Sequence, residues 1–471
     1  VRVRTFHALG REMLGEAGIA VEPLIDRDAL LRELWPASTP ADRGRLDLAF
    51  SRLKLDIRVT GEEVTADPAP GPVARAFVAY ERAVQASGGV DFDDLVVRAL
   101  RLLQEDVGAL ARWRARCREL LVDEAQDLDR TQLELALLLA APDNRVFLVG
   151  DDDQTIYGWR LADVRRVLGL AASLPGLRRV DLTTNYRCPR PVVERAVRLV
   201  EHNRERFAKR ILPGPAAGGR LVLAPEGSDE LVRVVRAMRT WPADESSRAI
   251  LARTNRELLP AVVAAVELGV AFRAPDLPLP IEDPRIDDLL ARLAGDELAA
   301  GAAGAATAPL LPRLGALRAM IRAQHEADGA DQARPPDPGD GPTLPELATA
   351  LLGWAPAFGD LAALRAAIEQ RRAALASLRR DDAALTLATA HGTKGLEWDH
   401  VIALADGFPG RRSISDAVEP ERALEEERRL AYVAWTRARR SLTLLYDPDA
   451  PSPFLREAFD PEELGLAARA A

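Results

Sequence analysis

The stretch "LLVDEAQD", residues 120–127, decides the fold class of this chain. Its three leading apolar residues have the length of a short buried strand, and the two carboxylates Asp123 and Glu124 follow directly. A carboxylate pair at the carboxyl end of a parallel strand is where nucleotide-hydrolysing enzymes hold a magnesium ion and activate water. Such enzymes also need a glycine-rich phosphate loop with a lysine. The stretch therefore predicts an α/β nucleotide-binding domain that requires such a loop.

Strand-like and helical runs alternate around this stretch. The strand-like runs "ELLVDE", "RVFLVGD" and "RRVDLTTN" are separated by helical runs such as "RTQLELALLLA". A second set begins at "RLVLAP" and "RAILARTN" and resumes at "LTLATAHG", "HVIALADG" and "RSLTLLYD". This alternation is typical of parallel α/β sheets. We therefore predict an α/β fold with two parallel-sheet domains.

Two further segments are helical or loop-like. The run "DFDDLVVRALRLL" opens with Asp91 as a candidate N-cap before an apolar stripe at helical spacing. Within residues 276–384, "GDELAAGAAGAATAP" and "ADGADQARPPDPGDGP" have loop compositions, and the helical run "LAALRAAIEQRRAALASL" follows. We interpret residues 276–384 as an insertion into the second α/β domain.

Length and composition limit the class of protein. A chain of 471 residues is too long for one compact core, and its length suggests about three domains. No apolar run approaches the roughly 20 residues that span a bilayer, so we expect no membrane partner. The two cysteines, Cys117 and Cys188, can form neither a metal cluster nor a disulfide framework, so we expect a cytoplasmic protein.

Charge is unevenly distributed along the chain. The net charge of -9 argues against a uniformly basic nucleic-acid-binding protein, yet arginines cluster at residues 112–118, 195–210 and 428–440. For any single cluster, the favoured interpretation is a solvated helix face.

A second polar turn follows the next predicted strand, in "VGDDDQTIYGWR". Gln154 is of the type that orients a water molecule or contacts a terminal phosphate in phosphate-transfer sites. Tyr157, Trp159 and Arg160 offer flat side chains on which unstacked bases can lie. The alternative is that the two aromatic residues are core residues, and the polar residues around them disfavour burial.

Two later stretches carry further candidates. In "TTNYRCP", Tyr186 can stack on a base and Arg187 can reach a phosphate, although the stretch alone indicates no more than a strand followed by a turn. The run "EEERRLAYVAWTRARR" predicts a helix on which Arg429 and Arg437 share a face. Between them, "TAHGTKGLEWDH" contains a turn with two glycines.

Together and in this order, the motifs closely resemble those of superfamily 1 DNA helicases of the UvrD, Rep and PcrA type. The resemblance covers nearly the whole chain, through "TFHALGREML", "DFDDLVVRAL", "LLVDEAQDLD", "VGDDDQTIYGWR", "NYRC", "AILARTN", "TAHGTKGLEWD" and "EERRLAYVAWTRAR".

The resemblance implies two RecA-like motor domains, each with a mainly helical insertion, with ATP in the cleft between them and single-stranded DNA across the top. The implied first motor domain is partial and comprises residues 1–15 and 88–188, with residues 16–87 as its insertion. The implied second motor domain comprises residues 189–275 and 385–450, with residues 276–384 as its reduced, loop-rich insertion. Residues 451–471 would form a C-terminal tail. It also implies 3′-to-5′ translocation on a single strand or on DNA with a single-stranded tail.

By motif position, five residues would act on the triphosphate of ATP. Asp123 would hold Mg²⁺ and Glu124 would activate the attacking water. Gln154 would contact the γ-phosphate, and Arg187 and Arg437 would act as arginine fingers.

The remaining roles concern the nucleoside and the DNA. By the same resemblance, Tyr186 would stack on adenine and Glu397 would contact the ribose. The DNA track, or its coupling to ATP, would include Thr5, His7, Tyr157, Trp159, Arg160 and His391. Lys394 fits the motif pattern without a role that the resemblance assigns.

The sequence departs from the family pattern at three places. It contains no G-x-x-x-x-G-K-[ST] phosphate loop, and "HGTKGLEW" is the nearest string. We therefore expect the chain to begin after that loop, with an open side next to "LLVDE". Leu161 stands where the family usually has glycine, beside the expected DNA track. The insertion at residues 276–384 is short and loop-rich for the family.

Three functions are compatible with these features. The first is an ATP-dependent DNA helicase present without its phosphate loop, and as given the chain is then expected to be inactive. The second is a non-catalytic single-strand-binding remnant of a helicase, or a partner subunit in a helicase–nuclease complex. The third is an unrelated ATPase with an Asp-Glu pair after a strand, which the aromatic and arginine motifs disfavour.

Overall fold

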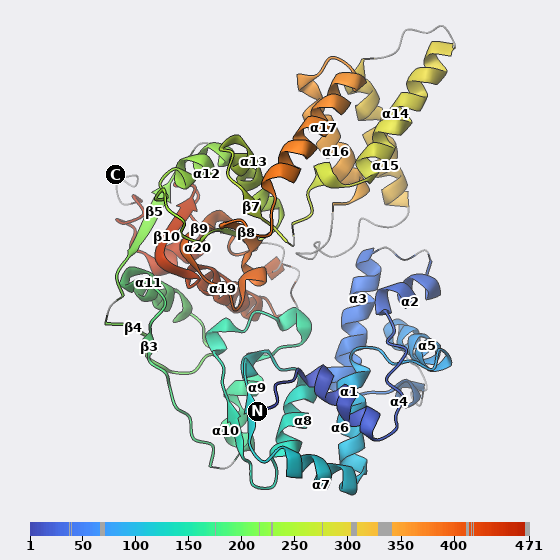
Figure 1. Ribbon diagram of the computed structural model, residues 1–471, viewed down its shortest axis with the longest axis vertical. Coiled ribbons are helices and arrows are strands. Elements are labelled where there is room, and N and C mark those ends of the chain that lie inside the picture. Colours follow the sequence, from blue (N-terminus) through green and yellow to red (C-terminus); the bar gives the residue numbers. More distant parts are fainter. Residues whose placement is uncertain are drawn as a thin grey trace. The chain divides into compact units, whose positions relative to one another are not determined.

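The computed structural model describes residues 1–36, 38, 40–65, 71–174, 176–215, 217–227, 229–275, 277–302, 309–327, 342–410, 414–415, 417 and 419–466 (Figure 1). The chain divides into two compact units. Unit 1 comprises Val1–Val180 and Glu205–Ala208, and unit 2 comprises Asp181–Arg204 and Lys209–Ala471.

Unit 1 is mainly helical up to residue 116. Its helices are α1 (Phe6–Glu16), α2 (Arg27–Leu34), α3 (Pro40–Ser51), the π-helix η1 (Arg52–Ile57), α4 (Gly61–Thr65), α5 (Pro72–Ala86), α6 (Asp94–Glu105) and α7 (Val107–Arg116). Helices α1 and α6 pack closely because Gly10 has no side chain, since a Cβ there would lie 2.2 Å from the Leu95 carbonyl oxygen. Helix α6 starts at Asp94, and Asp91 accepts a hydrogen bond from its backbone N–H at 2.9 Å.

The α/β part of unit 1 follows. It contains β1 (Leu120–Val122), η2 (Ala125–Asp127), α8 (Arg130–Ala140), β2 (Val146–Leu148), η3 (Asp152–Gln154), η4 (Gly158–Arg160), α9 (Val164–Leu168) and α10 (Leu170–Ser173). Strands β1 and β2 are parallel, with Val122 opposite Leu148, so both strands end at the same edge. This sheet has two strands among the described residues, and Leu121 and Phe147 are 66% and 63% exposed on it.

The strand predicted at residues 178–185 is mostly absent. Only β3 (Thr184–Asn185) forms, and it pairs in parallel with β4 (Leu212–Pro213) within unit 2. The two apolar residues of the predicted strand, Val180 and Leu182, are exposed, so burial does not stabilise a longer strand there. The prediction was wrong at this point.

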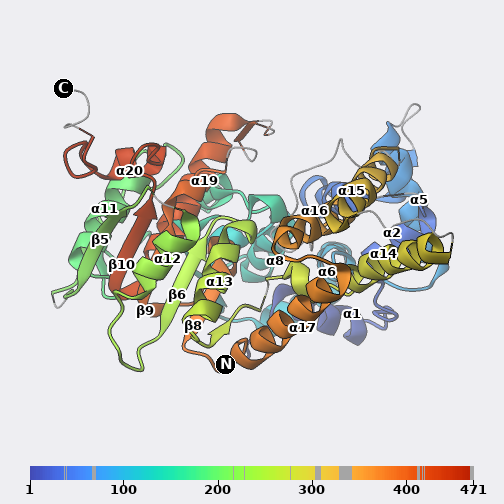
Figure 2. The ribbon, with the colours of Figure 1, turned by 90° about the horizontal axis from the view of Figure 1, so that it is seen from above.

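Unit 2 is built on a parallel sheet with strand order β5-β10-β9-β6-β8-β7 among the described residues. The strands are β5 (Arg220–Pro225), β6 (Arg248–Ala252), β7 (Phe272–Arg273), β8 (Leu385–Thr389), β9 (Trp398–Leu404) and β10 (Ala438–Tyr446). Figure 2 shows α12 (Glu230–Met238) and α13 (Leu259–Glu267) over one face. Over the other lie α11 (Arg190–Val200), α19 (Pro420–Trp435) and α20 (Pro453–Ala458).

The insertion at residues 276–384 is helical in its described part. Its helices are α14 (Arg285–Ala302), α15 (Leu310–Ala327), α16 (Leu344–Trp354) and α17 (Leu361–Leu378), which pack around their own apolar core (Figure 1). The predicted loop residues 303–308 and 328–341 lie outside the described residues. Residues 295–302 were also predicted as loop, but they belong to α14.

No single helix in the described part of the chain is both long and apolar enough to cross a membrane. Leu344–Ala357 and Leu361–Leu378 meet the requirements of length and composition only as a pair, which is bent by 107°.

Candidate functional site

Asp123 and Glu124 lie at the carboxyl end of β1, as the sequence predicts. The strand pairing ends where the N–H of Ala125 donates to the Val149 carbonyl at 2.8 Å. Glu124 then adopts a left-handed backbone conformation, with φ of 51° and ψ of 42°. This conformation costs free energy for any residue that has a side chain. Both carboxylates are exposed, and Asp123 offers oxygen atoms of the kind that Mg²⁺ prefers.

Gln126 connects this turn with the turn after β2. Its side-chain nitrogen donates to Glu124, and its side-chain oxygen accepts from the backbone N–H of Asp151 at 3.0 Å. Gln126 is 1% exposed, and a Cβ at Gly150 would lie 2.5 Å from its oxygen. The glycine in "VGDDDQ" therefore allows the close approach that brings the two acidic turns together. Gln126 stands inside the quoted motif but was not predicted as a site residue.

The turn after β2 contains Gln154 and a row of aspartates. Gln154 donates from its side chain to Asp151 at 2.8 Å, so it belongs to the same group as Glu124 and Gln126. One carboxylate oxygen from each of residues 151–153 lies within 4.8 Å of the other two. Asp153 binds the guanidinium of Arg206 at 3.0 and 2.8 Å, which gives this buried carboxylate a structural role.

The predicted stacking residues are partly exposed. The rings of Tyr157 and Trp159 meet edge to face, with centroids 6.1 Å apart, and the Arg160 guanidinium lies 4.6 Å from the Trp159 centroid. Trp159 is 39% exposed, which agrees with the prediction that it is not a core residue. Leu161 has φ of 67°, a conformation that glycine adopts most readily, and this explains why its position favours glycine.

The N-terminal motif carries a second aromatic pair. Thr5 is the N-cap of α1 and accepts from the N–H of Ala8 at 3.2 Å, so its hydroxyl has a structural role. His7 stacks on Phe92, with ring centroids 3.9 Å apart and an interplanar angle of 24°. Burial lowers the pKa of His7, and the Asp93 charge partly opposes this effect. The sequence analysis missed Phe92, which is 53% exposed.

In unit 2, Arg187 and Glu397 form an ion pair, although they are 210 residues apart. The side chain of Asn185 accepts from the backbone N–H of Arg187 at 3.0 Å and shapes the turn after β3. Arg439 lies 3.5 Å from the other Glu397 oxygen. Tyr186, in the same turn, is 82% exposed, so its ring is available to a ligand.

Arg437 does not lie on the predicted helix. Helix α19 ends at Trp435, and the hydroxyl of Thr436 donates to the Tyr432 carbonyl at 2.8 Å at this end. Arg437 is 1% exposed, and its Nε donates to the Val433 carbonyl at 2.9 Å. Its Nη1 donates to the Leu396 carbonyl at 3.3 Å, which ties the end of α19 to the turn that carries Glu397.

His391 is held as a neutral imidazole. Burial lowers its pKa to about 3, and the positive charge of Arg253 acts in the same direction. The sequence places His391 in the DNA track or its coupling to ATP, and a neutral ring is compatible with coupling through hydrogen bonds.

Comparison with known proteins identifies two helicase domains in this chain. Residues 45–175 match the UvrD/REP helicase N-terminal domain, and residues 357–448 match the UvrD-like helicase C-terminal domain. DNA helicase II of Escherichia coli is 28% identical over 447 residues, which cover 79% of this chain and 62% of that protein. The ATP-dependent DNA helicase Rep of the same species is 31% identical, over 48% of this chain and 36% of Rep. PcrA of Leuconostoc citreum is 32% identical, over 39% of this chain and 26% of PcrA.

The chain is similar to UvrD-like superfamily 1 helicases in both matched domains. It spans less than two thirds of the length of these UvrD-like relatives.

Within each unit of this UvrD-like chain, some of the predicted site residues lie close together. In unit 1, the Gln126 bridge joins the turn of Glu124 to that of Gln154. In unit 2, Arg187 and Glu397 are in contact. The convergence of the two sets on one nucleotide stays a prediction.

Asp129 is the N-cap of α8, and its burial leads us to predict how stability depends on pH. Burial raises the pKa of Asp129 to about 6. The hydrogen bond that Asp129 accepts from the backbone N–H of Gln132 at 2.8 Å lowers this pKa but does not outweigh burial. Because the folded pKa lies above the ordinary value, this carboxylate stabilises the fold less as pH rises from about 4 to about 6. Asp129→Asn keeps the cap without the charge and should raise the free energy of unfolding at pH 7.5 by about 1–3 kcal/mol.

The measurement is urea unfolding at several pH values between 5 and 8, and the gain should increase up to about pH 6 and stay constant above it. The matched control is Asp106→Asn, because Asp106 is an exposed N-cap that accepts from Ala109 at 2.9 Å. An equal gain in both variants, or a gain that does not depend on pH, would contradict the argument.

Proposed function

We propose that this chain is the DNA-translocating and nucleotide-hydrolysing machinery of a UvrD-type helicase, acting 3′ to 5′ on single-stranded DNA or on DNA with a single-stranded tail. The observation that carries the proposal is the Gln126 bridge, which brings the Asp123–Glu124 turn and the Gln154 turn to one edge of a parallel sheet. Ligands of α/β sheets bind at such an edge. The direction of translocation rests on the family resemblance alone.

In this proposal, the cofactors are ATP and Mg²⁺. Bound Mg²⁺ would neutralise charge on the phosphates, and Asp123 is the residue that would hold it. Glu124 would accept a proton from the attacking water, and its contact with Gln126 fixes the orientation of its carboxylate. Gln154 would contact the γ-phosphate from the neighbouring turn.

The residues of unit 2 would complete the reaction site. Arg187 would stabilise charge on the transferred phosphoryl group, for which it has to exchange its Glu397 partner for phosphate oxygens. Arg437 would act in the same way after its side chain leaves the Val433 and Leu396 carbonyls. Glu397 and Tyr186 would contact the ribose and the adenine.

The DNA track would use the exposed aromatic faces of unit 1. His7, Phe92, Tyr157 and Trp159 provide ring surfaces, and Arg160 adds positive charge beside Trp159. Stacking on such faces tolerates any base, as translocation along DNA requires. His391 would couple the track to the nucleotide. We also propose that the protein acts in the cytoplasm, because its relatives are DNA helicases.

A second candidate function would use the aromatic faces of unit 1 alone. The 471 residues contain no G-x-x-x-x-G-K-[ST] motif. A non-catalytic single-strand-binding protein, or a partner subunit of a helicase–nuclease complex, would need the aromatic faces without the phosphate loop.

The missing motif generates a prediction about activity. Without a loop of backbone N–H groups and a lysine, the β- and γ-phosphates lose most of their binding site. The chain as given should therefore show no ATP hydrolysis above that of its Glu124→Gln variant, with or without oligo-dT. A coupled phosphate-release assay measures this. DNA-stimulated hydrolysis that disappears in Glu124→Gln would contradict the prediction.

The aromatic faces generate a prediction about DNA binding. Trp159→Ala and Phe92→Ala should each weaken binding of oligo-dT by about 1–3 kcal/mol, because each removes a stacking surface. Fluorescence anisotropy with a labelled oligo-dT measures the affinity, and circular dichroism verifies the fold. Phe147→Ala is the matched control, since Phe147 is more exposed than either ring, at 63%, but lies on β2, outside the proposed track. Unchanged affinity in the first two variants would contradict the stacking role of these rings.

A further inference from the structure

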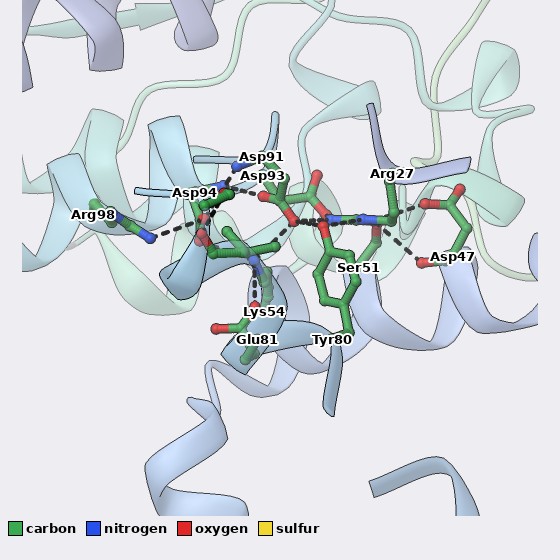
Figure 3. Close-up of polar contacts among 12 residues, drawn as sticks. Arg27, Asp47, Ser51, Lys54, Tyr80, Glu81, Asp91, Asp93, Asp94 and Arg98 are labelled. Atoms are coloured by element: carbon green, nitrogen blue, oxygen red, sulfur yellow. Dashed lines mark hydrogen bonds and ion pairs between the residues drawn. The ribbon is translucent and has the colours of Figure 1, made fainter. Parts of the chain in front are cut away.

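A buried network of charged and polar side chains surrounds the loop that carries Phe92. Figure 3 shows two cations, Arg27 and Lys54, between carboxylates from three segments of unit 1, namely α3, α5 and residues 91–94. The network comprises Arg27, Asp47, Ser51, Lys54, Tyr80, Glu81, Asp91, Asp93, Asp94 and Arg98. We call Arg27, Ser51, Lys54 and Tyr80 the clamp, because they bind the carboxylates on either side of Phe92.

The carboxylate of Asp91, immediately before Phe92, accepts hydrogen bonds from three side chains. Its Oδ2 accepts from Arg27 at 2.6 Å, Lys54 at 2.8 Å and the Tyr80 hydroxyl at 2.7 Å. Asp91 is 1% exposed. Burial alone would raise the pKa of this carboxyl, but the charges of Lys54 and Arg27 outweigh it and hold the pKa well below its usual range. Asp91 is therefore a fixed anion.

Asp93, immediately after Phe92, is bound by the same clamp. Its Oδ2 accepts from Arg27 at 2.7 Å and from the Ser51 hydroxyl at 2.6 Å. One guanidinium nitrogen of Arg27 thus serves the carboxylates on both sides of Phe92. The backbone of residue 92 is held at both ends while its ring faces solvent.

Lys54 anchors the clamp to the rest of unit 1. It is 3% exposed and forms ion pairs with Glu81 at 2.7 Å and Asp94 at 2.9 Å, besides Asp91. Its segment is the π-helix η1, a rare element that is often found at functional sites. The next carbonyl, that of Leu55, accepts from the Thr131 hydroxyl at 2.6 Å, which links η1 to α8.

This arrangement is an expensive way to stabilise a loop. Ions buried in pairs lose hydration, and well-packed apolar residues would often stabilise a fold as well or better. A rigid exposed ring, in contrast, benefits a binding site, because less side-chain freedom is lost when a ligand stacks on it. Phe92 is such a ring, since it is 53% exposed and already stacked on His7.

We propose that Arg27, Lys54 and Tyr80 are positioning residues that hold Phe92 against His7 as a rigid stacking platform for unpaired bases. The inference rests on the proposed function, because it presumes that the chain binds single-stranded DNA. The clamp residues do not touch the DNA. They act through Phe92.

The test uses the full chain and a labelled oligo-dT. Tyr80→Phe removes the hydrogen bond that the hydroxyl donates to Asp91 and the one that it accepts from Arg27 at 3.2 Å. It keeps the ring in its apolar surroundings, so the variant should fold and bind about two- to five-fold more weakly. Lys54→Met removes a charge and should weaken binding about as much as Phe92→Ala. The matched control is Tyr446→Phe in unit 2, whose buried hydroxyl has no hydrogen-bond partner among the described residues. This control should bind as the parent does.

A double variant separates positioning from direct contact. If Tyr80 acts through Phe92, then Tyr80→Phe should add little to the loss that Phe92→Ala causes. The salt dependence of binding should be unchanged in Tyr80→Phe and Lys54→Met, because no phosphate contact is lost. Additive losses, or a smaller salt dependence in Lys54→Met, would overturn the proposal.

Hydrogen exchange without DNA distinguishes failure of the clamp from failure of the proposed function. Tyr80→Phe should speed amide exchange in residues 91–98 and leave unit 2 unchanged. If the parent fails to bind oligo-dT while exchange responds in this way, the proposed DNA function is wrong and the clamp is upheld. Exchange that is unchanged in residues 91–98 would overturn the clamp whatever the DNA result.

Discussion

The parallel pairing of β1 with β2 is the constraint on which the candidate nucleotide site depends. Parallel strands end at the same edge, so the turns that follow Val122 and Leu148 are neighbours although 26 residues separate their strands. Gln126 then joins them by bonding to Glu124 and to the backbone of Asp151. This contact converts two acidic turns into one polar group, and the absence of a side chain at Gly150 makes it possible.

Buried charge is the second organising feature, and several arginines contribute to it. Arg253 binds Glu427 through two nitrogens, and Arg428 binds Glu457 in the same way. Each pair joins segments distant in sequence, as Arg206 does with Asp153 in unit 1. A planar guanidinium suits this task because it binds a carboxylate through two parallel hydrogen bonds. Removing one partner of such a pair would leave a buried charge without compensation.

The sequence predicted the parts of the site that local pattern encodes. The ends of two strands, before Asp123 and before Gly150, follow from the hydrophobic runs that precede them. The exposure of Trp159 follows from its polar neighbours. The helix start near Asp91 was also recognised, within three residues of its true position at Asp94. These features depend on residues close in the chain, which is why a single sequence reveals them.

Features set by distant contacts were missed or misread. The arginines at 428–440 were interpreted as a solvated helix face, but Arg428, Arg429 and Arg437 are buried in unit 2. Phe92 looked like an ordinary apolar residue before a helix, because its exposure depends on the clamp that binds its two neighbours. The buried position of Lys54 could not be predicted either, since its partners lie 27 to 40 residues further along the chain. Periodicity and spacing carry no information about such partners.

Photo-crosslinking can show directly whether the aromatic faces of unit 1 receive single-stranded DNA. An oligo-dT in which 5-iododeoxyuridine replaces single thymidines would be irradiated with the full chain, and the crosslinked peptides identified by mass spectrometry. We expect crosslinks at His7 or Phe92 and at Tyr157 or Trp159, because stacked aromatic rings lie within reach of the reactive base. Crosslinks confined to other segments, with these four residues unmodified, would contradict this expectation.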